Sequence, residues 1–344
     1  MLRFVSILGC GRTASAMCAY LMERGVSVTI WDRDSTKMEE IGKNGIRITG
    51  CCAGLFHPRA TVQIEQAVSS SQYLFVMTAA EGHLPIAKRL HGLLRPDQRI
   101  LIFNGNWGAY EFCTELGQEL AEKNVVVSET GSMIFLADYD ASGAVHIKKI
   151  KNEIAMASIP KEAAPQVLRE LADVLPQLLP EDNVLCTSFN NSNLVIHTPI
   201  TLFNFTRVEN GEDFFFYGQA ATRSVIRYIE KVDEERCRVA HRIGIRTQTC
   251  LEIINSFWPD KYDDLYDAIK CNEAYQTGKG PTSLNYRYIS EDVPFGMAPV
   301  AALGKRYGVP TPYIDAMLAC YRGLLDGVPF HSPDFSRMDV TEML

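Results

Sequence analysis

The strongest constraint on the fold lies near the start of the chain, where an apolar strand, a glycine turn, a helix and a second strand follow in order. A short apolar run precedes Gly9, Gly11 and Ala14, which form a G-x-G-x-x-A pattern. The pattern predicts a helix over about 13–24 and a second strand over 26–31. A complete β-α-β unit of this kind is typical of dinucleotide-binding domains.

Each position of the glycine pattern has its own physical role. Gly9 permits a tight turn, Gly11 lets the backbone approach a pyrophosphate, and Ala14 allows close packing of helix on strand. The free N–H groups of the first helical turn, at Arg12 and Thr13, would point at the phosphates. We therefore predict that these five residues bind the cofactor.

Two residues at the tip of the second strand bear on the choice of nucleotide. The carboxylate of Asp32 would accept hydrogen bonds from the ribose hydroxyls and repel a 2′-phosphate, which favours NAD. Arg33 follows directly, and an arginine there can hold a 2′-phosphate, so NADP stays open. Both residues are predicted to contact the cofactor.

The rest of the first half alternates strands with helices. Strands are predicted at 73–77, 99–103 and 125–129, with two more within 146–160 and a helix over 161–175. This alternation predicts an α/β fold with a doubly wound parallel sheet. Because ligands bind at the carboxyl ends of such strands, Thr78, Asn104 and Thr130 are expected near the cofactor. Helix capping is an equally good interpretation of each.

The character of the sequence changes near residue 180, after which helical periodicity dominates. A long charged helix is predicted near 221–242, with further helices to about 325. We predict an NAD(P)-binding Rossmann domain over 1–180, an all-helical domain over 181–344, and an active site between them. The polar tail, 331–344, is predicted to be loosely held.

Composition narrows the classes of partner. The net charge of −7 argues against nucleic acid or an anionic membrane. No run of about 18 apolar residues exists, so no membrane span is expected. The start, MLRFVSILGCG, indicates a strand rather than a signal peptide. Ten scattered cysteines without metal-ligand spacing predict reduced, buried thiols in a cytoplasmic protein and no metal site, with Cys51 and Cys52 structural.

A polar stripe runs along the otherwise apolar segment 190–205. Its members are three or four residues apart: Asn190, Asn193, His197, Thr201 and Asn204. On a helix they would share one face, while the apolar remainder predicts burial all round. Buried polar groups need partners, so the stripe either contacts protein or lines a cavity. Pro199 predicts a kink beside His197.

His197 is the candidate for proton transfer, because an imidazole can both give and take a proton near neutrality. A lone histidine in an apolar helix is more often a core residue, and the polar stripe favours the catalytic interpretation. Asn193, one turn away, could hydrogen-bond a ligand. A histidine base needs a carboxylate to orient it. The stretch 285–299 offers acids before a proline, although a solvated helix cap is the commoner meaning of that pattern.

Six ordered segments resemble the opine dehydrogenases of the octopine, nopaline and N-(1-carboxyethyl)-norvaline type, over nearly the whole chain. They are GCGRTASA with Asp32, FNGNWGAYEF, SETGSMIF, NVLCTSFNNSNLVIHTP, YGQAATRSVIRYIEKVDEER and RYISEDVPFG. The N-x-x-x-H-P motif of the family matches Asn193 and His197, with a threonine inserted before the proline. Its R-Y-x-x-E-D-V-P motif matches Arg287 and Asp292. Arg223 stands where the family usually has a proline, which bears on substrate specificity.

The resemblance implies a helical domain like that of 6-phosphogluconate dehydrogenase and a reductive condensation. An amino acid and a 2-oxo acid, commonly pyruvate, would form an imine that NAD(P)H reduces. His197 and Asp292 would be the acid–base pair. Arg287 would bind a substrate carboxylate, and Asn193 would contact substrate or nicotinamide.

Two other functions stay open from the sequence. One is a dehydrogenase of a simple hydroxy acid, of the 3-hydroxyacid or ketopantoate type, which needs no amine substrate. The other is a non-catalytic NAD(H)-sensing protein. The sensor would bind a partner through its helical domain, whereas the enzymes would act on small molecules. The apolar helical faces allow a homodimer. The aromatic run 214–217 could shape a pocket, although such runs are more often core.

Overall fold

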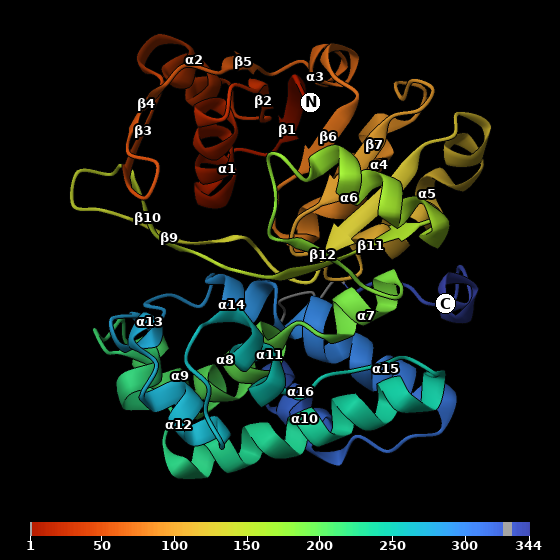
Figure 1. Cartoon of the computed structure of the whole chain (residues 1–344). Helices are drawn as coiled ribbons and strands as arrows, with labels where there is room; N and C mark the ends of the chain where they lie inside the picture. The colour runs from red at the N-terminus through yellow and green to blue at the C-terminus, as the bar shows by residue number, and fades with distance from the viewer. Residues whose placement is uncertain (1, 326–331) are drawn as a thin grey trace. The chain divides into compact units, whose positions relative to one another are not determined.

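The computed structural model describes residues 2–325 and 332–344 and divides the chain into two compact units (Figure 1). The first unit runs to Ser188 and includes Met343, and the second comprises 189–342 with Leu344. The sequence analysis places the division near residue 180. Among the described residues, no helix is both long and apolar enough to cross a membrane.

The first unit is built on an eight-stranded sheet in the order β12-β11-β8-β7-β6-β1-β2-β5. Its strands are β1 (Phe4–Leu8), β2 (Ser27–Trp31), β5 (Arg59–Thr61), β6 (Tyr73–Val76), β7 (Arg99–Ile102), β8 (Val126–Thr130), β11 (Ile154–Ile159) and β12 (Leu178–Pro180). All neighbours pair in parallel except β11 with β8. The predicted doubly wound parallel sheet is confirmed.

The central strands β6 and β7 are buried along their whole length, which is why they are nearly continuous apolar runs instead of alternating patterns. Every residue of β6, β7 and β8 is buried. Helices alternate with the strands: α1 (Arg12–Glu23), α2 (Ser35–Asn44), α3 (Ile64–Ser70), η1 (Ala80–Gly82), α4 (His83–Leu90), α5 (Gly108–Glu122), η2 (Lys161–Ala163), α6 (Ala164–Leu171) and α7 (Val184–Phe189).

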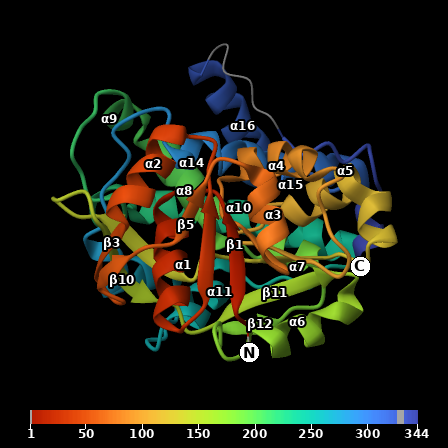
Figure 2. The same cartoon turned by 90° about the horizontal axis from the view of Figure 1, so that it is seen from above.

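A second sheet, absent from the sequence prediction, covers α1. It has four strands in the order β4-β3-β10-β9: β3 (Ile46–Gly50), β4 (Gly54–Phe56), β9 (Phe135–Tyr139) and β10 (Val145–Ile150). Helix α1 contacts β2 of the large sheet and all four strands of this small sheet (Figures 1 and 2). All eight residues from Ala14 to Leu21 are therefore buried, as expected of a helix that is apolar nearly all round. The two strands predicted within 146–160 exist, but they belong to different sheets.

One buried residue of the first unit has an unusual environment. His83, the first residue of α4, is fully buried, and within the described part of the chain neither ring nitrogen has a hydrogen-bond partner. Its ring packs against the start of α5, where a Cβ at Gly108 would lie 2.7 Å from Nδ1. Burial lowers the pKa of His83 to about 3, because the charged form would lose its hydration.

This burial predicts a loss of stability in acid. Below pH ~6.5 the unfolded chain takes up a proton at His83 and the folded chain does not, so the free energy of unfolding falls as the pH falls toward 3. Between pH 7 and 5 the expected contribution is about 2 kcal/mol. Urea denaturation of His83→Leu should show that much less pH dependence than the unmodified protein. The exposed His241, replaced by leucine, is the control, and equal pH dependence in both variants would refute the prediction.

The second unit is helical in its described residues, as predicted. Its elements are α8 (Ser192–Phe203), α9 (Phe205–Glu209), π-helix η3 (Phe216–Ala220), α10 (Arg223–Ile243), α11 (Cys250–Phe257), α12 (Leu265–Lys270), α13 (Glu273–Gln276), α14 (Arg287–Ser290), π-helix η4 (Val293–Met297), α15 (Ala298–Tyr307), α16 (Pro312–Leu324) and η5 (Val340–Met343). The long helix α10, capped by Thr222 and closed by Gly244 at φ +94°, packs its apolar face against α8, α15 and α16 (Figure 1).

Three sequence expectations are wrong. Phe203, expected in the buried surface of its helix, is 52% exposed at the end of α8. The tail, apart from His331, which lies outside the described residues, is packed: Val340 is fully buried, and Arg306 of α15 donates to Phe335 O at 2.6 Å and pairs with Asp339. The cysteines are free thiols, but only Cys10, Cys18, Cys186 and Cys250 are buried.

Candidate functional site

Several members of the polar stripe on α8 find partners within the second unit, whereas the buried Thr201 Oγ1 has no hydrogen-bond partner among the described residues. Asn190 and Asn204 lie just outside the helix ends, where Asn190 Oδ1 accepts from Gln248 N at 2.9 Å and Asn204 Nδ2 donates to Ile200 O at 2.9 Å. Helix α8 continues through Pro199 as one element. The side chains at the two ends of the stripe therefore hydrogen-bond to the backbone. His197, in the middle of the stripe, is the candidate for chemistry.

His197 is buried and contacts a carboxylate from a distant part of the chain. The residue is 4% exposed, and Nδ1 lies 2.7 Å from Oδ2 of Asp292, which follows the short helix α14. Asp292 is fully buried, and its Oδ1 has no hydrogen-bond partner among the described residues. A buried carboxylate with one oxygen on the imidazole favours a proton on Nδ1 and would stabilise the imidazolium.

The other ring nitrogen of His197 meets Tyr217, which the sequence marks only as a member of the aromatic run 214–217. Nε2 lies 2.9 Å from the hydroxyl of Tyr217, in η3. Burial first, and then the neighbouring tyrosines, raise the pKa of Tyr217 well above its ordinary value, so this phenol stays protonated. With a proton on Nδ1 for Asp292, Nε2 is the acceptor and Tyr217 the donor, an assignment made from the hydrogen-bond network.

Aromatic rings fix the orientation of the imidazole. The ring of Tyr288 stacks on His197 with centroids 3.9 Å apart, and Phe216 meets the imidazole edge-on at 5.7 Å. In the aromatic run 214–217, Phe214 and Phe216 are buried core residues, as is usual for such runs. Phe215 is 38% exposed. Tyr288 is the tyrosine of the R-Y-x-x-E-D-V-P motif, so the motif could have identified it as a site residue.

Both hydrogen-bonding partners of His197 lie in or directly before a π-helical turn. Tyr217 is part of η3, and Asp292 is the residue that leads into η4. Single π-turns are frequent at functional sites, because the wider turn re-aims a side chain. Lys270 Nζ holds η3 by donating to the carbonyls of Tyr217 at 3.1 Å and Gly218 at 2.7 Å. No sequence pattern of apolar residues marks such a turn, which is why the contact of Tyr217 with His197 was not predicted.

Arg287 and Asn193 occupy half-buried positions in this unit. Arg287 begins α14, and its Nε lies 3.5 Å from Glu291 Oε2. Burial favours the neutral form, but the carboxylates of Glu291 and Asp292 raise the pKa of Arg287 above its ordinary value, so it is a permanent cation. Asn193 lies in the first turn of α8, and its backbone N–H donates to Asn191 Oδ1 at 3.1 Å.

The glycine turn of the first unit has the shape that a dinucleotide requires. Gly9 has φ +114°, and a Cβ there would lie 2.8 Å from Met77 O. A Cβ on Gly11 would meet nothing within 4 Å, so the space before it is open. Among the described residues no side chain caps α1, which begins at Arg12, and its first N–H groups are available to a phosphate. Ala14 is fully buried, as close packing needs.

Asp32 lies directly beside the glycine turn. Its Oδ2 accepts from Cys10 N at 2.9 Å and its Oδ1 from Asp34 N at 3.1 Å. Arg33 is exposed. Arg12 reaches the small sheet, where it pairs with Asp138 at 2.9 Å. The turn, Asp32 and the start of α1 therefore form one cradle that fits a dinucleotide.

The three residues predicted at later strand ends differ in what they do. Thr78 approaches Gly9, and its buried hydroxyl has no hydrogen-bond partner within the described ranges, as a ligand-facing group would. Asn104 adopts a left-handed φ of 58°, and its N–H donates to Thr130 Oγ1 at 3.1 Å. The Thr130 hydroxyl in turn donates to Ser132 O at 2.9 Å, so it serves the loop backbone.

Sequence reasoning also missed Glu129, a fully buried carboxyl at the end of β8. It accepts from Thr187 Oγ1 at 2.5 Å, Ser188 Oγ at 2.6 Å and Ala109 N at 2.9 Å. Burial raises its pKa despite these donors. Glu129 thereby ties α7 and the start of α5 to the sheet.

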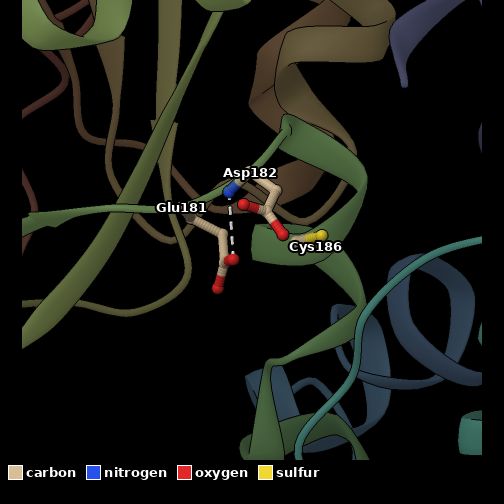
Figure 3. A group of neighbouring side chains, drawn as sticks. All are labelled: Glu181, Asp182 and Cys186. Atoms are coloured by element: carbon tan, nitrogen blue, oxygen red, sulfur yellow. Dashed lines mark hydrogen bonds between the residues drawn. The ribbon is translucent and has the colours of Figure 1, made fainter.

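Three potential metal ligands gather at the start of α7. Glu181, Asp182 and Cys186 place one ligand atom each within 4.8 Å of one another (Figure 3). Glu181 and Asp182 are partly or fully exposed, and Glu181 Oε1 already accepts from Asp182 N at 3.0 Å. Acidic groups at a surface gather in this way without an ion, so the expectation of no metal site stays a prediction.

Two family models match this chain, one in each half. Residues 180–325 match the α-helical domain of NAD/NADP octopine/nopaline dehydrogenases. Residues 5–158 match ketopantoate reductase PanE/ApbA. The helical match contains His197, Tyr217 and Asp292.

Individual relatives extend over the whole chain. An opine dehydrogenase of Arthrobacter sp. (strain 1C) is 34% identical over 325 residues, covering 93% of this chain and 90% of that protein. The structure of octopine dehydrogenase in complex with NADH and agmatine is similar with a TM-score of 0.77 at 17% identity, covering 99% of this chain and 95% of that one. The NADP+-bound yersinopine dehydrogenase is similar with a TM-score of 0.76 at 16% identity, covering 99% and 96%.

Proposed function

The chain belongs to the opine dehydrogenase family of NAD(P)-dependent oxidoreductases that act on CH–NH donors, and on that premise we propose that it condenses an amino acid with a 2-oxo acid. The amine and the oxo group would lose water to give an imine, whose reduction yields a secondary amine dicarboxylate. The observation that carries this proposal is the 2.7 Å contact between His197 and Asp292, since imine chemistry needs a base that can also act as an acid.

His197 would hold the proton that the reaction moves. It would store a proton released when the substrate amine becomes a free nucleophile, and return one when the carbinolamine loses its hydroxyl as water. Asp292 would orient the imidazole and stabilise its cation, because a buried carboxylate beside Nδ1 lowers the energy of the charged ring. NAD(P)H, when bound, supplies the hydride.

Substrate binding is assigned to Arg287 and Asn193. The planar guanidinium of Arg287 suits a substrate carboxylate and is partly exposed, with a side chain 33% accessible. Asn193, four residues before His197 on α8, would hydrogen-bond substrate or nicotinamide. The oxo acid is proposed to be pyruvate. Arg223 replaces a proline common in the family, and we assign it to the choice of amino donor.

The cradle around Gly9 and Gly11 would bind the dinucleotide, with the first turn of α1 on its phosphates and Asp32 on the adenosine ribose. Relatives of similar fold include one with NADH and one with NADP+, so both nucleotides belong in any assay. Ten free cysteines fit a reducing, cytoplasmic location.

A second candidate is a dehydrogenase of a simple hydroxy acid, favoured by the match of residues 5–158 to ketopantoate reductase. That match covers the nucleotide-binding half. The half that carries His197 and Asp292 matches octopine/nopaline dehydrogenases instead, and this favours the condensation.

The proposal predicts strict dependence on two organic substrates. Oxidation of NADH or NADPH, followed by absorbance, is expected only when a 2-oxo acid and an amino acid are both present, because reduction needs the imine. A matrix of amino acids against 2-oxo acids measures this directly. Oxidation with the oxo acid alone would establish the hydroxy-acid alternative, and tight NADH binding without turnover over the whole matrix would establish an NAD(H) sensor.

A further inference from the structure

The imidazole of His197 is engaged on both sides by side chains of its own unit. Nδ1 meets Asp292 Oδ2 at 2.7 Å, and Nε2 meets the Tyr217 hydroxyl at 2.9 Å. The face of the ring is covered by Tyr288, with centroids 3.9 Å apart. A substrate proton therefore reaches Nε2 either after Tyr217 has moved away or through the Tyr217 hydroxyl itself.

The surroundings of Tyr217 oppose movement. Lys270 binds its carbonyl and that of Gly218, which pins the π-turn that carries it. Its ring packs on Tyr275 with centroids 4.7 Å apart, and Tyr275 is held in turn by a hydrogen bond from Trp258 Nε1 at 3.3 Å. Moving the side chain would break the bond to His197 and this aromatic packing together.

Within the reaction proposed above, and resting on it, we propose that Asp292, His197 and Tyr217 form a proton relay. The Tyr217 hydroxyl is the group at its end that exchanges a proton with the reacting substrate. Tyr217 is then a catalytic residue, and His197 acts on the substrate through it.

The protons balance in both directions. When the substrate ammonium becomes an amine, its proton passes to the phenolic oxygen as the phenolic proton passes to Nε2, leaving neutral tyrosine and an imidazolium beside Asp292. When the carbinolamine dehydrates, the phenol gives its proton to the departing hydroxyl, the C–O bond breaks and water leaves. The proton on Nε2 then restores the phenol, and the imidazole is neutral again.

The surroundings of Tyr217 and His197 suit this order of proton transfers. Burial raises the pKa of Tyr217, so the phenol is a full proton donor at neutral pH and not a phenolate. The buried Asp292 stabilises the imidazolium that exists between the two transfers.

Tyr217→Phe removes the end of the relay and keeps the ring. We expect the turnover number to fall at least about 100-fold, the low end for loss of a general acid–base group, with KM for both organic substrates changed only a few-fold. Tyr313→Phe, which removes the hydroxyl of an exposed tyrosine on α16, is the control and is expected to stay within a few-fold of the unmodified protein. The rate in H2O–D2O mixtures should curve for the unmodified protein, as two protons move together.

A turnover number for Tyr217→Phe that is within a few-fold of the unmodified protein, or above it, would overturn the relay. That result is expected if Tyr217 only blocks Nε2 and moves away before the substrate reaches it. The 15N signal of His197 Nε2 provides a readout that does not need activity. It is expected to shift in Tyr217→Phe and not in Tyr313→Phe, and an unshifted signal in Tyr217→Phe also counts against the relay. If the unmodified protein shows no amine-dependent oxidation of NADH, the proposed function fails. If it is active and Tyr217→Phe is equally active, only the relay fails.

Discussion

Replacing His197 by alanine is expected to lower the turnover number about 100- to 10,000-fold, the range that general acid–base catalysis supplies. The imidazole is buried between Asp292 and Tyr217, so alanine removes the group that stores the proton in imine formation. Affinity for NADH is expected to stay close to that of the unmodified protein, because the glycine cradle belongs to the first unit. Steady-state kinetics and NADH fluorescence titration measure the two quantities.

His241→Ala is the matched control, because it removes an exposed histidine at the end of α10. It is expected to leave the turnover number nearly unchanged. A His197→Ala protein that is folded, binds NADH and turns over within a few-fold of the unmodified protein would show that another group handles the proton.

The second large effect is expected at Asp292. Changing it to asparagine keeps the shape of the side chain but removes the charge. The new amide can donate to Nδ1 and so favour the wrong tautomer, with the proton of the imidazole on Nε2. The corresponding change in a histidine–carboxylate pair costs about 10,000-fold in turnover, and we expect a loss of that order here. Turnover measured across a pH series gives the loss together with its dependence on protonation.

The adjacent Glu291→Gln is the control for charge. Its carboxylate pairs with Arg287, the proposed carboxylate-binding residue, so its removal is expected to change KM for the carboxylate substrates far more than the turnover number. If Asp292→Asn behaves like Glu291→Gln, the carboxylate at 292 only balances charge and does not orient the imidazole.

The nucleotide-binding half could be predicted from local sequence because its signals are local. Turn glycines, an apolar strand on each side and an acid at the strand end are all fixed by residues close together in the chain. The same logic failed for the small sheet over α1, because β3 and β10 are paired although about a hundred residues separate them. Helix α1 did carry a clue: it is apolar nearly all round, which a single sheet would not explain.

The chemical residues of the second unit were only partly accessible. The stripe on α8 pointed to His197, but the meeting of residues 197 and 292 depends on packing over 95 positions, and only the family resemblance suggested it. Tyr217 was named in the aromatic run 214–217, but its contact with His197 was inaccessible for a different reason. A π-turn, which contains one residue more than an α-helical turn, points Tyr217 at the imidazole. Neither the helical nor the strand periodicity of a sequence reveals such a turn.

Two errors concern the ends of elements. Phe203 was assigned to the core by its apolar neighbours, yet it lies in the last turn of α8, where the helix leaves the packed region. The tail looked polar enough to be loose, but Asp339 and the carbonyl of Phe335 bind Arg306, and Val340 fills a buried site. Average polarity hides a few anchoring residues.

The central claim is that two substrates are joined through an imine, and product analysis tests it most directly. The protein would be incubated with NADH, pyruvate and an amino acid that supports NADH oxidation, and the products identified by mass spectrometry. We predict a secondary amine dicarboxylate whose mass is that of the two substrates less water plus two hydrogens, carrying one deuterium when the NADH is labelled at the transferred position. Recovery of the unchanged amino acid together with the 2-hydroxy acid would contradict the account.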